Sequence, residues 1–193
     1  LAYFRRNPTE TDREWLMQAV QHLQATPSTR NLVDAHSALW TVSPSGNAVT
    51  ALLTYWRERD DTGELRRNLL DQDLSSRFLG DLYEELSVSA KEKFALRQTP
   101  DFVEEFILDQ TLEPALAERP LDGFRMIDPA CGSGHFLLGA FPRLLARWEK
   151  HAPRLDIRER VQRCLDALNG VDLNPFAVAI SRFRLTLVAM HAI

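Results

Sequence analysis

The chain has 193 residues, 45% of them hydrophobic, which is enough to bury a core and build one domain or slightly more. Its formal net charge of -4 is the opposite of the basic surface expected of a domain that grips the phosphate backbone of DNA. No apolar run approaches the roughly 20 residues of a membrane span, and the N-terminus lacks the pattern of a secretory signal, so we expect a cytoplasmic protein with no membrane partner.

Residues 1–90 are predicted to form a helical region. A capping box opens an amphipathic helix over 11–26. A turn at 44–47 precedes a second amphipathic helix, and a third apolar stripe lies within 75–86. We interpret these stripes as core faces, and a change of composition near residue 90 marks the expected domain boundary.

Residues 91–193 are predicted to form the first part of an α/β domain that is incomplete at its C-terminus. Thr99 is a suitable N-cap, and Pro100 a suitable first helical residue, for a helix whose apolar residues extend to Leu112. The chain starts at Leu1 rather than Met and ends within an apolar helical pattern. We therefore expect it to be an excerpt of a longer protein.

Two strand-loop-helix units follow this helix. The first predicted strand, 124–127, leads into a helix from His135, and the second, 171–173, leads into a helix from Pro175. A further amphipathic helix is expected at 156–168. Because strands that alternate with helices favour a parallel sheet, the sequence predicts a parallel, doubly wound α/β fold.

The loop after the first predicted strand reads Asp128-Pro129-Ala130-Cys131-Gly132-Ser133-Gly134-His135-Phe136. A glycine loop between a strand and a helix places backbone amides and a helix N-terminus beside a ligand at the carboxyl end of a sheet. Glycine lets the backbone approach the ligand, so a side chain at Gly134 is expected to intrude between the two. A bare structural turn is the main alternative.

The acidic residues near this loop indicate which ligand it suits. A dinucleotide fingerprint needs a third small residue where this chain has Leu137, and an acid about 20 residues further on, so NAD is the weaker interpretation. Asp128 suits a cationic ammonium group and Asp172 suits a ribose diol, because carboxylates accept strong charge-assisted hydrogen bonds. S-adenosylmethionine contains both groups, so these residues favour it as the cofactor.

We assign no chemical role to the two cysteines or to the histidine of the loop. Neither Cys131 nor Cys164 belongs to a CxxC or Cys/His cluster, so the sequence predicts no disulfide framework and no metal site. No base is paired with Cys131 in the sequence, which favours a small loop residue over a nucleophile. His135 is expected to be partly exposed and inert.

Three motifs resemble those of the adenine-N6 DNA methyltransferases of restriction-modification systems. Residues 128–134, with Phe136, resemble the first motif of that family, and residues 172–175 resemble the second. Residues 98–103 resemble its Thr-Pro motif, although Gln98 stands where the family usually has Tyr. The resemblance implies a Rossmann-like methyltransferase fold. The cofactor-binding residues that it implies are Thr99, Pro100, Asp128, Pro129, Ala130, Cys131, Gly132, Gly134, Phe136, Asp172, Leu173 and Asn174.

Residues 78–184 resemble most closely the PglX family, the large methyltransferases of phage-growth-limitation (BREX-type) defence systems. The resemblance implies a whole protein that methylates adenine in host double-stranded DNA, which it binds through regions outside this chain. Other defence proteins would then tell the marked host DNA from phage DNA. A polypeptide that also restricts DNA is the nearest variant.

The catalytic loop of this family is absent from the sequence. In the family, an (N/D/S)PP(Y/F) loop after the fourth strand accepts the amino hydrogens of the flipped adenine and stacks on its ring. Asn174-Pro175-Phe176 has one proline and follows the second strand, so we assign it to cofactor binding and assign no catalytic residue to this chain. The expected reaction is direct in-line methyl transfer without a metal. Methylation of protein glutamine or RNA, and a non-catalytic scaffold, remain alternatives.

Overall fold

The computed structural model describes residues 6–26, 29–33, 37, 40, 43–66 and 99–193. The chain divides into two compact units, Leu1–Leu74 and Ser75–Ile193, and each is described by itself. The predicted stripe within 75–86, Gln98 and the expected boundary near residue 90 lie outside the described residues. The division into 1–90 and 91–193 therefore stays a prediction.

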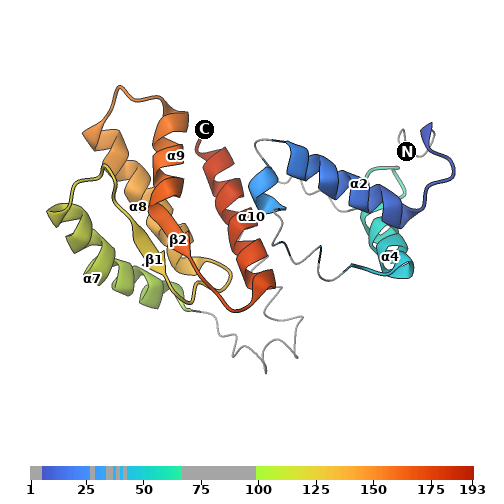
Figure 1. The fold of residues 1–193 in the computed structure, drawn as a ribbon, viewed down its shortest axis with the longest axis horizontal. Coiled ribbons are helices and arrows are strands. Elements are labelled where there is room, and N and C mark those ends of the chain that lie inside the picture. Colours follow the sequence, from blue (N-terminus) through green and yellow to red (C-terminus); the bar gives the residue numbers. More distant parts are fainter. Residues whose placement is uncertain (1–5, 27–28, 34–36, 38–39, 41–42, 67–98) are drawn as a thin grey trace. The chain divides into compact units, whose positions relative to one another are not determined.

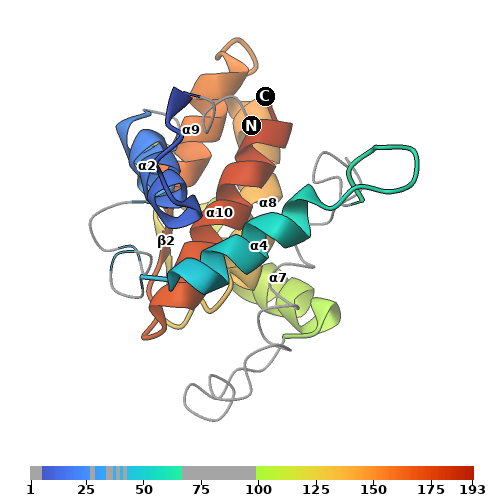
Figure 2. The same ribbon diagram turned by 90° about the vertical axis from the view of Figure 1, so that its right-hand side faces the viewer.

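The first unit includes α2 (Asp12–Ala25), the 3-10 helix η1 (Arg30–Leu32) and α4 (Gly46–Arg57), which are seen from a second side in Figure 2. Thr11 and Glu14 form the predicted capping box, in which Thr11 N donates to Glu14 Oε2 at 2.7 Å. α2 contacts α4, and the buried residues of these two helices are Val20, Val49 and Leu53. Both predicted helices are thus confirmed, and their apolar stripes supply core residues.

The second unit includes, in chain order, α7 (Asp101–Glu118), β1 (Met126–Asp128), α8 (His135–His151), α9 (Ile157–Ala167), β2 (Leu168–Gly170) and α10 (Pro175–His191). β1 and β2 pair in parallel, with Met126 opposite Leu168 and Asp128 opposite Gly170. α8 and α9 form the crossover that parallel strands require (Figure 1). The predicted parallel pairing is confirmed for these two strands, and the wider doubly wound sheet stays a prediction.

α8 is the central element of the second unit, because it contacts α7, α9, α10 and β2. Its buried residues include Phe141, Leu144 and Trp148. Gly139 lets α7 approach α8 closely, since a Cβ built on Gly139 would lie 2.8 Å from Leu108 Cδ1. The glycine loop that precedes α8 is therefore attached to a firmly packed helix.

β2 differs from the predicted strand. It occupies Leu168–Gly170 rather than 171–173 and follows α9 without an intervening turn. Gly170 permits this placement, because a Cβ on it would lie 2.7 Å from Leu137 Cδ1 and 3.0 Å from Cys131 Sγ. A residue with a side chain would keep β2 away from the glycine loop.

The starts of β1 and α7 also differ from the predictions. β1 begins at Met126, because Phe124 lies in a turn in which its N–H donates to Leu121 O at 3.0 Å. Pro100 is the N-cap of α7, and its carbonyl accepts the first helical hydrogen bonds. The prediction of Thr99 as the N-cap is therefore wrong. None of the helices in the described ranges is long and apolar enough to cross a membrane.

Candidate cofactor site

The two loops singled out in the sequence meet at the carboxyl ends of β1 and β2. Because the strands are parallel, the β1–α8 loop and the β2–α10 loop leave the sheet at the same edge (Figure 1). Backbone hydrogen bonds join them: Val171 N donates to Asp128 O, and Cys131 N donates to Val171 O, each at 2.9 Å. Residues about forty positions apart in the chain thus form one structure.

Asp172 holds the two loops together through its carboxylate. Its Oδ2 accepts a hydrogen bond from Gly132 N at 2.8 Å, and its Oδ1 accepts one from Asn174 N at 2.7 Å. The side chain is half-buried. A carboxylate has about four acceptor positions, so each oxygen of Asp172 keeps the capacity to accept a further bond from a ligand.

Asp128, at the end of β1, has an incompletely satisfied carboxylate. Its Oδ1 accepts a hydrogen bond from Ala130 N at 3.1 Å. Its Oδ2 is buried and has no hydrogen-bond partner within the described part of the chain. Burial raises the pKa of Asp128, the Ala130 N–H lowers this pKa, and the neighbouring charge of Asp172 raises it. A donor or cation placed beside Oδ2 would relieve this cost.

The two glycines of the loop have different surroundings. Both have positive φ, 52° at Gly132 and 93° at Gly134, which favours glycine. A Cβ on Gly132 would enter open space, whereas a Cβ on Gly134 would lie 3.0 Å from Ser181 Cβ in α10. We expected a side chain at Gly134 to intrude on a ligand. The structure instead places α10 there, so Gly132 is the glycine with an open side.

The two helices that leave the loops begin differently. Asn174 caps α10: its Oδ1 accepts from Phe176 N at 3.1 Å and from Ala177 N at 3.4 Å, and the residue is fully buried. Gly134 is the N-cap of α8 and offers no side-chain hydrogen bond to the helix. The first N–H groups of α8 therefore have no acceptor from a cap side chain, and Gly134 and His135 are both buried at this end of the helix.

α10 also reaches back to the first loop through Arg184, which is not among the predicted site residues. Arg184 is 2% exposed, and its guanidinium donates to Ser133 O at 2.8 Å and Ser133 Oγ at 3.2 Å. Arg184 and Ser181 lie three residues apart on one face of α10, and both contact the loop. The available signal was the pair of arginines in α10, Arg182 and Arg184, of which the fold buries Arg184.

The remaining predicted residues occupy several environments. Cys131 is buried, and desolvation raises the pKa of its thiol to about 11, which agrees with its interpretation as a non-nucleophilic residue. Leu173 is 93% exposed, Pro129 and Ala130 are exposed, and Phe136 packs against the core.

Thr99 and Pro100 lie at the start of α7, and no hydrogen bond among the described residues joins them to the glycine loop. The role of every predicted residue in cofactor binding stays a prediction. His135, expected to be partly exposed, is instead buried, because α8 begins inside the packed unit.

Comparisons with known proteins show what the segment around the two loops is similar to. Residues 109–192, which include both loops and α10, match the family described as "MmeI, DNA-methyltransferase domain". The two loops are therefore part of a segment related to DNA methyltransferases.

The full chain resembles a particular kind of methyltransferase. Over 98% of its length it is 44% identical to the adenine-specific methyltransferase PglX of Streptomyces coelicolor. Over 62% of its length it is 28% identical to a Methanocaldococcus jannaschii protein that is named as a type II restriction enzyme and methyltransferase. The chain is thus a relative of adenine-specific methyltransferases, which confirms the resemblance found in its motifs.

The chain spans 16% of the length of the Streptomyces protein and 14% of the length of the Methanocaldococcus protein. No solved structure matches it.

Proposed function

We propose that the protein containing this chain is an S-adenosylmethionine-dependent methyltransferase that acts on the exocyclic amino group of adenine in DNA. In this proposal, the chain forms part of the cofactor pocket. The observation that carries the proposal is the pair of carboxylates, Asp128 and Asp172, at the carboxyl ends of two paired parallel strands, with Asp128 Oδ2 buried and lacking a partner among the described residues.

The chemistry of these residues fits S-adenosylmethionine. The ammonium group of the cofactor would supply the donors that Asp128 Oδ2 lacks, and its ribose hydroxyls would use the remaining acceptor capacity of Asp172. Gly132 faces open space, so the backbone can approach a ligand there. The cofactor, when bound, supplies the methyl group.

The residues of this chain bind and orient the cofactor but do not activate adenine. Asn174, in the Asn-Pro-Phe sequence that resembles a catalytic loop, uses its side-chain oxygen to cap α10 and is fully buried. It is therefore not placed to accept the amino hydrogens of a flipped base. The base-binding loop would come from a part of the protein outside this chain, and the reaction would be in-line methyl transfer promoted by positioning.

The biological setting is proposed from the relatives. The similarity to PglX supports a role in a phage-defence system of the BREX type, in which methylation marks host DNA in the cytoplasm. DNA would be held by other regions, since this chain has a net charge of -4. Other defence proteins would then read the mark.

The test uses the whole purified protein and its natural double-stranded DNA. Calorimetry should show binding of S-adenosylmethionine, and tritiated methyl from the cofactor should appear on adenine in the DNA. A protein fraction and RNA serve as competing acceptors in the same assay. Label on a protein glutamine or on RNA, with none on DNA, would transfer the assignment to those alternatives. Binding of the cofactor with no methyl transfer to any acceptor would indicate an inactive S-adenosylmethionine-binding scaffold, and absence of cofactor binding would contradict the proposal.

A further inference from the structure

Arg184 is a buried cation aimed at the glycine loop, and the proposed chemistry assigns it no task. It lies in α10, 51 residues from Ser133 in the chain, and donates to both the backbone carbonyl and the hydroxyl of that residue. Ser133 itself is 3% exposed. A charged group this deeply buried is costly unless its contacts repay the lost hydration.

The contact restrains the peptide group between Ser133 and Gly134 from both ends. Arg184 binds its carbonyl oxygen, and the N–H on its other side donates to Cys131 O at 2.8 Å. Because a peptide group is planar, fixing both ends fixes its orientation. The loop then enters α8 through Gly134, whose φ of 93° lies in the left-handed region that favours glycine.

The same helix restrains the loop at two further points. Ser181 fills the space beside Gly134, and Asn174 N, at the start of α10, donates to the carboxylate of Asp172 that also holds Gly132. The loop backbone is therefore shaped from the side of α10, and the open side of Gly132 is left for a ligand.

We propose that Arg184 is a positioning residue that fixes the glycine loop in the shape that binds the cofactor. The inference rests on the proposed function, since it concerns the same site. Arg184 does not touch the cofactor in this account. It acts through the Ser133 carbonyl, so that the loop need not be ordered at the moment of binding.

Substitutions of Arg184 should lower cofactor affinity more than they lower the stability of the fold. Arg184→Met keeps much of the buried chain length and removes both hydrogen bonds, and we expect S-adenosylmethionine to bind about 10- to 100-fold more weakly. Arg184→Lys keeps the charge but not the planar guanidinium that reaches two oxygens, so an intermediate loss is expected. Ser133→Ala removes only the hydroxyl contact and should cost the least.

The experiment measures three quantities on the whole protein: the dissociation constant of S-adenosylmethionine, the melting temperature without cofactor, and the split between KM for the cofactor and kcat. Arg182→Met is the matched control, because Arg182 is an exposed arginine two residues away on α10. The control should keep the wild-type affinity. For Arg184→Met we expect a higher KM with little change in kcat at saturating cofactor.

The outcomes separate this inference from the proposed function. A folded Arg184→Met protein that binds the cofactor as tightly as wild type would overturn the positioning role, while the proposed function would stand. Loss of folding in both the Met and the Lys variants would also overturn it and give Arg184 a purely structural role. If the wild-type protein does not bind S-adenosylmethionine, the proposed function itself fails, and the inference fails with it.

Discussion

Asp128 is the last residue of β1, Asp172 lies two residues after the end of β2, and the two carboxylates are in different states before a ligand arrives. Asp172 has both oxygens bonded to backbone N–H groups, whereas Asp128 has one oxygen bonded and the other buried without a partner among the described residues. Asp172 therefore organises the loops, and Asp128 carries an energetic cost that a ligand can relieve. The two should respond differently to substitution.

Asp128→Asn should weaken S-adenosylmethionine binding while stabilising the cofactor-free loop. The raised pKa of Asp128 means that the charged carboxylate is disfavoured in the folded state. The contribution of Asp128 to the stability of the fold is therefore present at low pH, where the carboxyl is protonated, and is lost as the pH rises through the raised pKa. Asparagine removes the buried charge at neutral pH. Calorimetry should show a loss of about 1.5 to 3 kcal/mol, or roughly one to two decades in affinity.

Hydrogen exchange of the loop peptide in the cofactor-free protein checks the stability half of this prediction, with slower exchange in the Asn variant at neutral pH. Lowering the pH through the Asp128 pKa should weaken cofactor binding to wild type and leave the Asn variant nearly unchanged. Wild-type affinity in Asp128→Asn would remove Asp128 from the site.

Gly134→Ala should destabilise the second unit more than Gly132→Ala does. Both changes place a side chain at positive φ, which costs about 1 to 2 kcal/mol of stability. Only Gly134→Ala also brings the new methyl group into overlap with Ser181. Ser181→Gly should relieve part of that overlap in the double variant. Melting temperatures of the wild type, Gly132→Ala, Gly134→Ala and the double variant Gly134→Ala with Ser181→Gly test this. Equal losses in the two alanine variants, with no recovery in the double variant, would contradict the packing of Gly134 against Ser181.

At the scale of elements, α10 connects the two loops and α8 joins them to the core. Local signals predicted most of the helices, because capping and apolar spacing act within a few residues, as in the capping box at Thr11 of α2. The contacts of Arg184 with Ser133 could not be predicted in this way, since they join residues 51 positions apart. β2 was misplaced because its position depends on Gly170 fitting against α8 and the glycine loop.

Asn174→Ala should loosen the start of α10. Loss of its two cap hydrogen bonds costs about 1 kcal/mol. Hydrogen exchange in the first turn of α10 should accelerate accordingly, and Asn174→Asp, which keeps the acceptor oxygen, should accelerate it less. If Asn174→Ala leaves exchange unchanged, the cap does not stabilise the helix.

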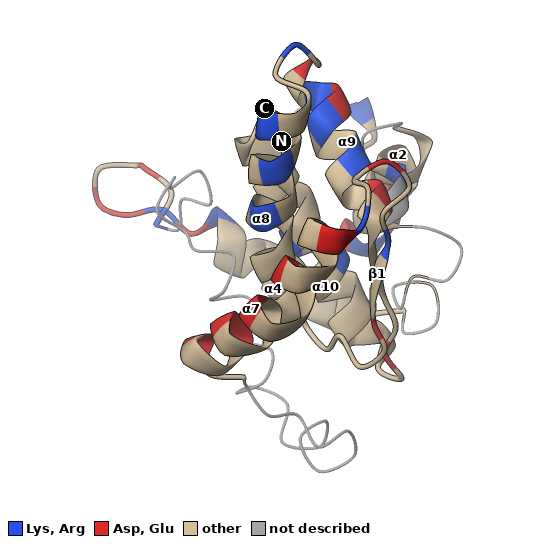
Figure 3. Cartoon of the chain, turned by 90° about the vertical axis from the view of Figure 1, so that its left-hand side faces the viewer, with Lys and Arg blue, Asp and Glu red and all other residues tan. Residues whose placement is uncertain are grey.

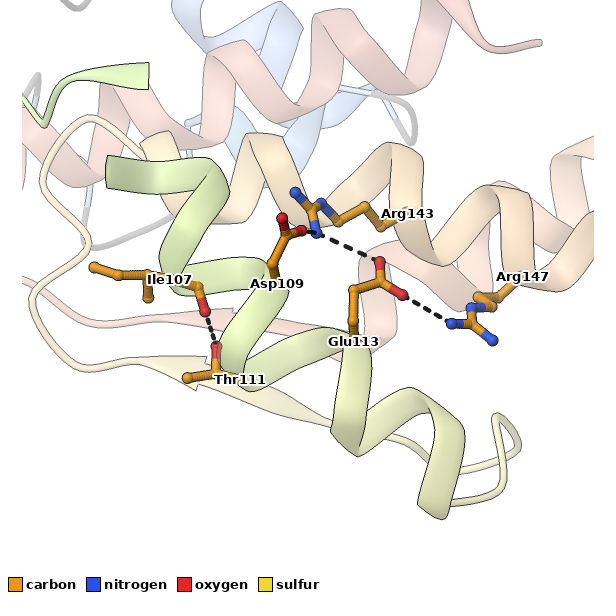
Figure 4. Close-up of polar contacts among 6 residues, drawn as sticks. All are labelled: Ile107, Asp109, Thr111, Glu113, Arg143 and Arg147. Carbon is orange, nitrogen blue, oxygen red and sulfur yellow. Dashed lines mark hydrogen bonds and ion pairs between the residues drawn. The ribbon is translucent and has the colours of Figure 1, made fainter. Parts of the chain in front are cut away.

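α7 and α8 are joined at the surface by charged side chains. Figure 3 shows acidic residues along α7 and basic residues on α8 and α9. In Figure 4, Glu113 lies between Arg143 and Arg147, at 3.4 Å and 2.8 Å, and Asp109 also pairs with Arg143. The hydrogen bond from Thr111 Oγ1 to Ile107 O belongs to α7 alone.

Glu113→Gln should weaken the α7–α8 contact only modestly, by up to about 1 kcal/mol, because the partners are partly exposed. The effect should shrink at high salt. Hydrogen exchange of α7 at low and high ionic strength measures it, with the exposed Glu118→Gln as the matched control. A loss that is independent of salt would indicate packing rather than charge.

For the whole molecule, the comparison is with a longer protein, since the chain spans 16% of the length of its Streptomyces relative. The motifs at 128–136 and 172–175 were enough to predict the class, since they hold the residues that meet at the strand ends. The base-binding and DNA-binding regions are proposed to lie elsewhere. Adenine methylation by the whole protein therefore has to be tested in the intact system.

The most direct measurement is a single-molecule sequencing map of N6-methyladenine in genomic DNA from three strains: wild type, a deletion of this protein, and an Asp172→Ala replacement. We expect methyladenine at one short, recurring sequence in wild type, its loss in the deletion strain, and its loss or strong reduction in the replacement strain. Identical methyladenine maps in the wild-type and deletion strains would contradict adenine methylation by this protein.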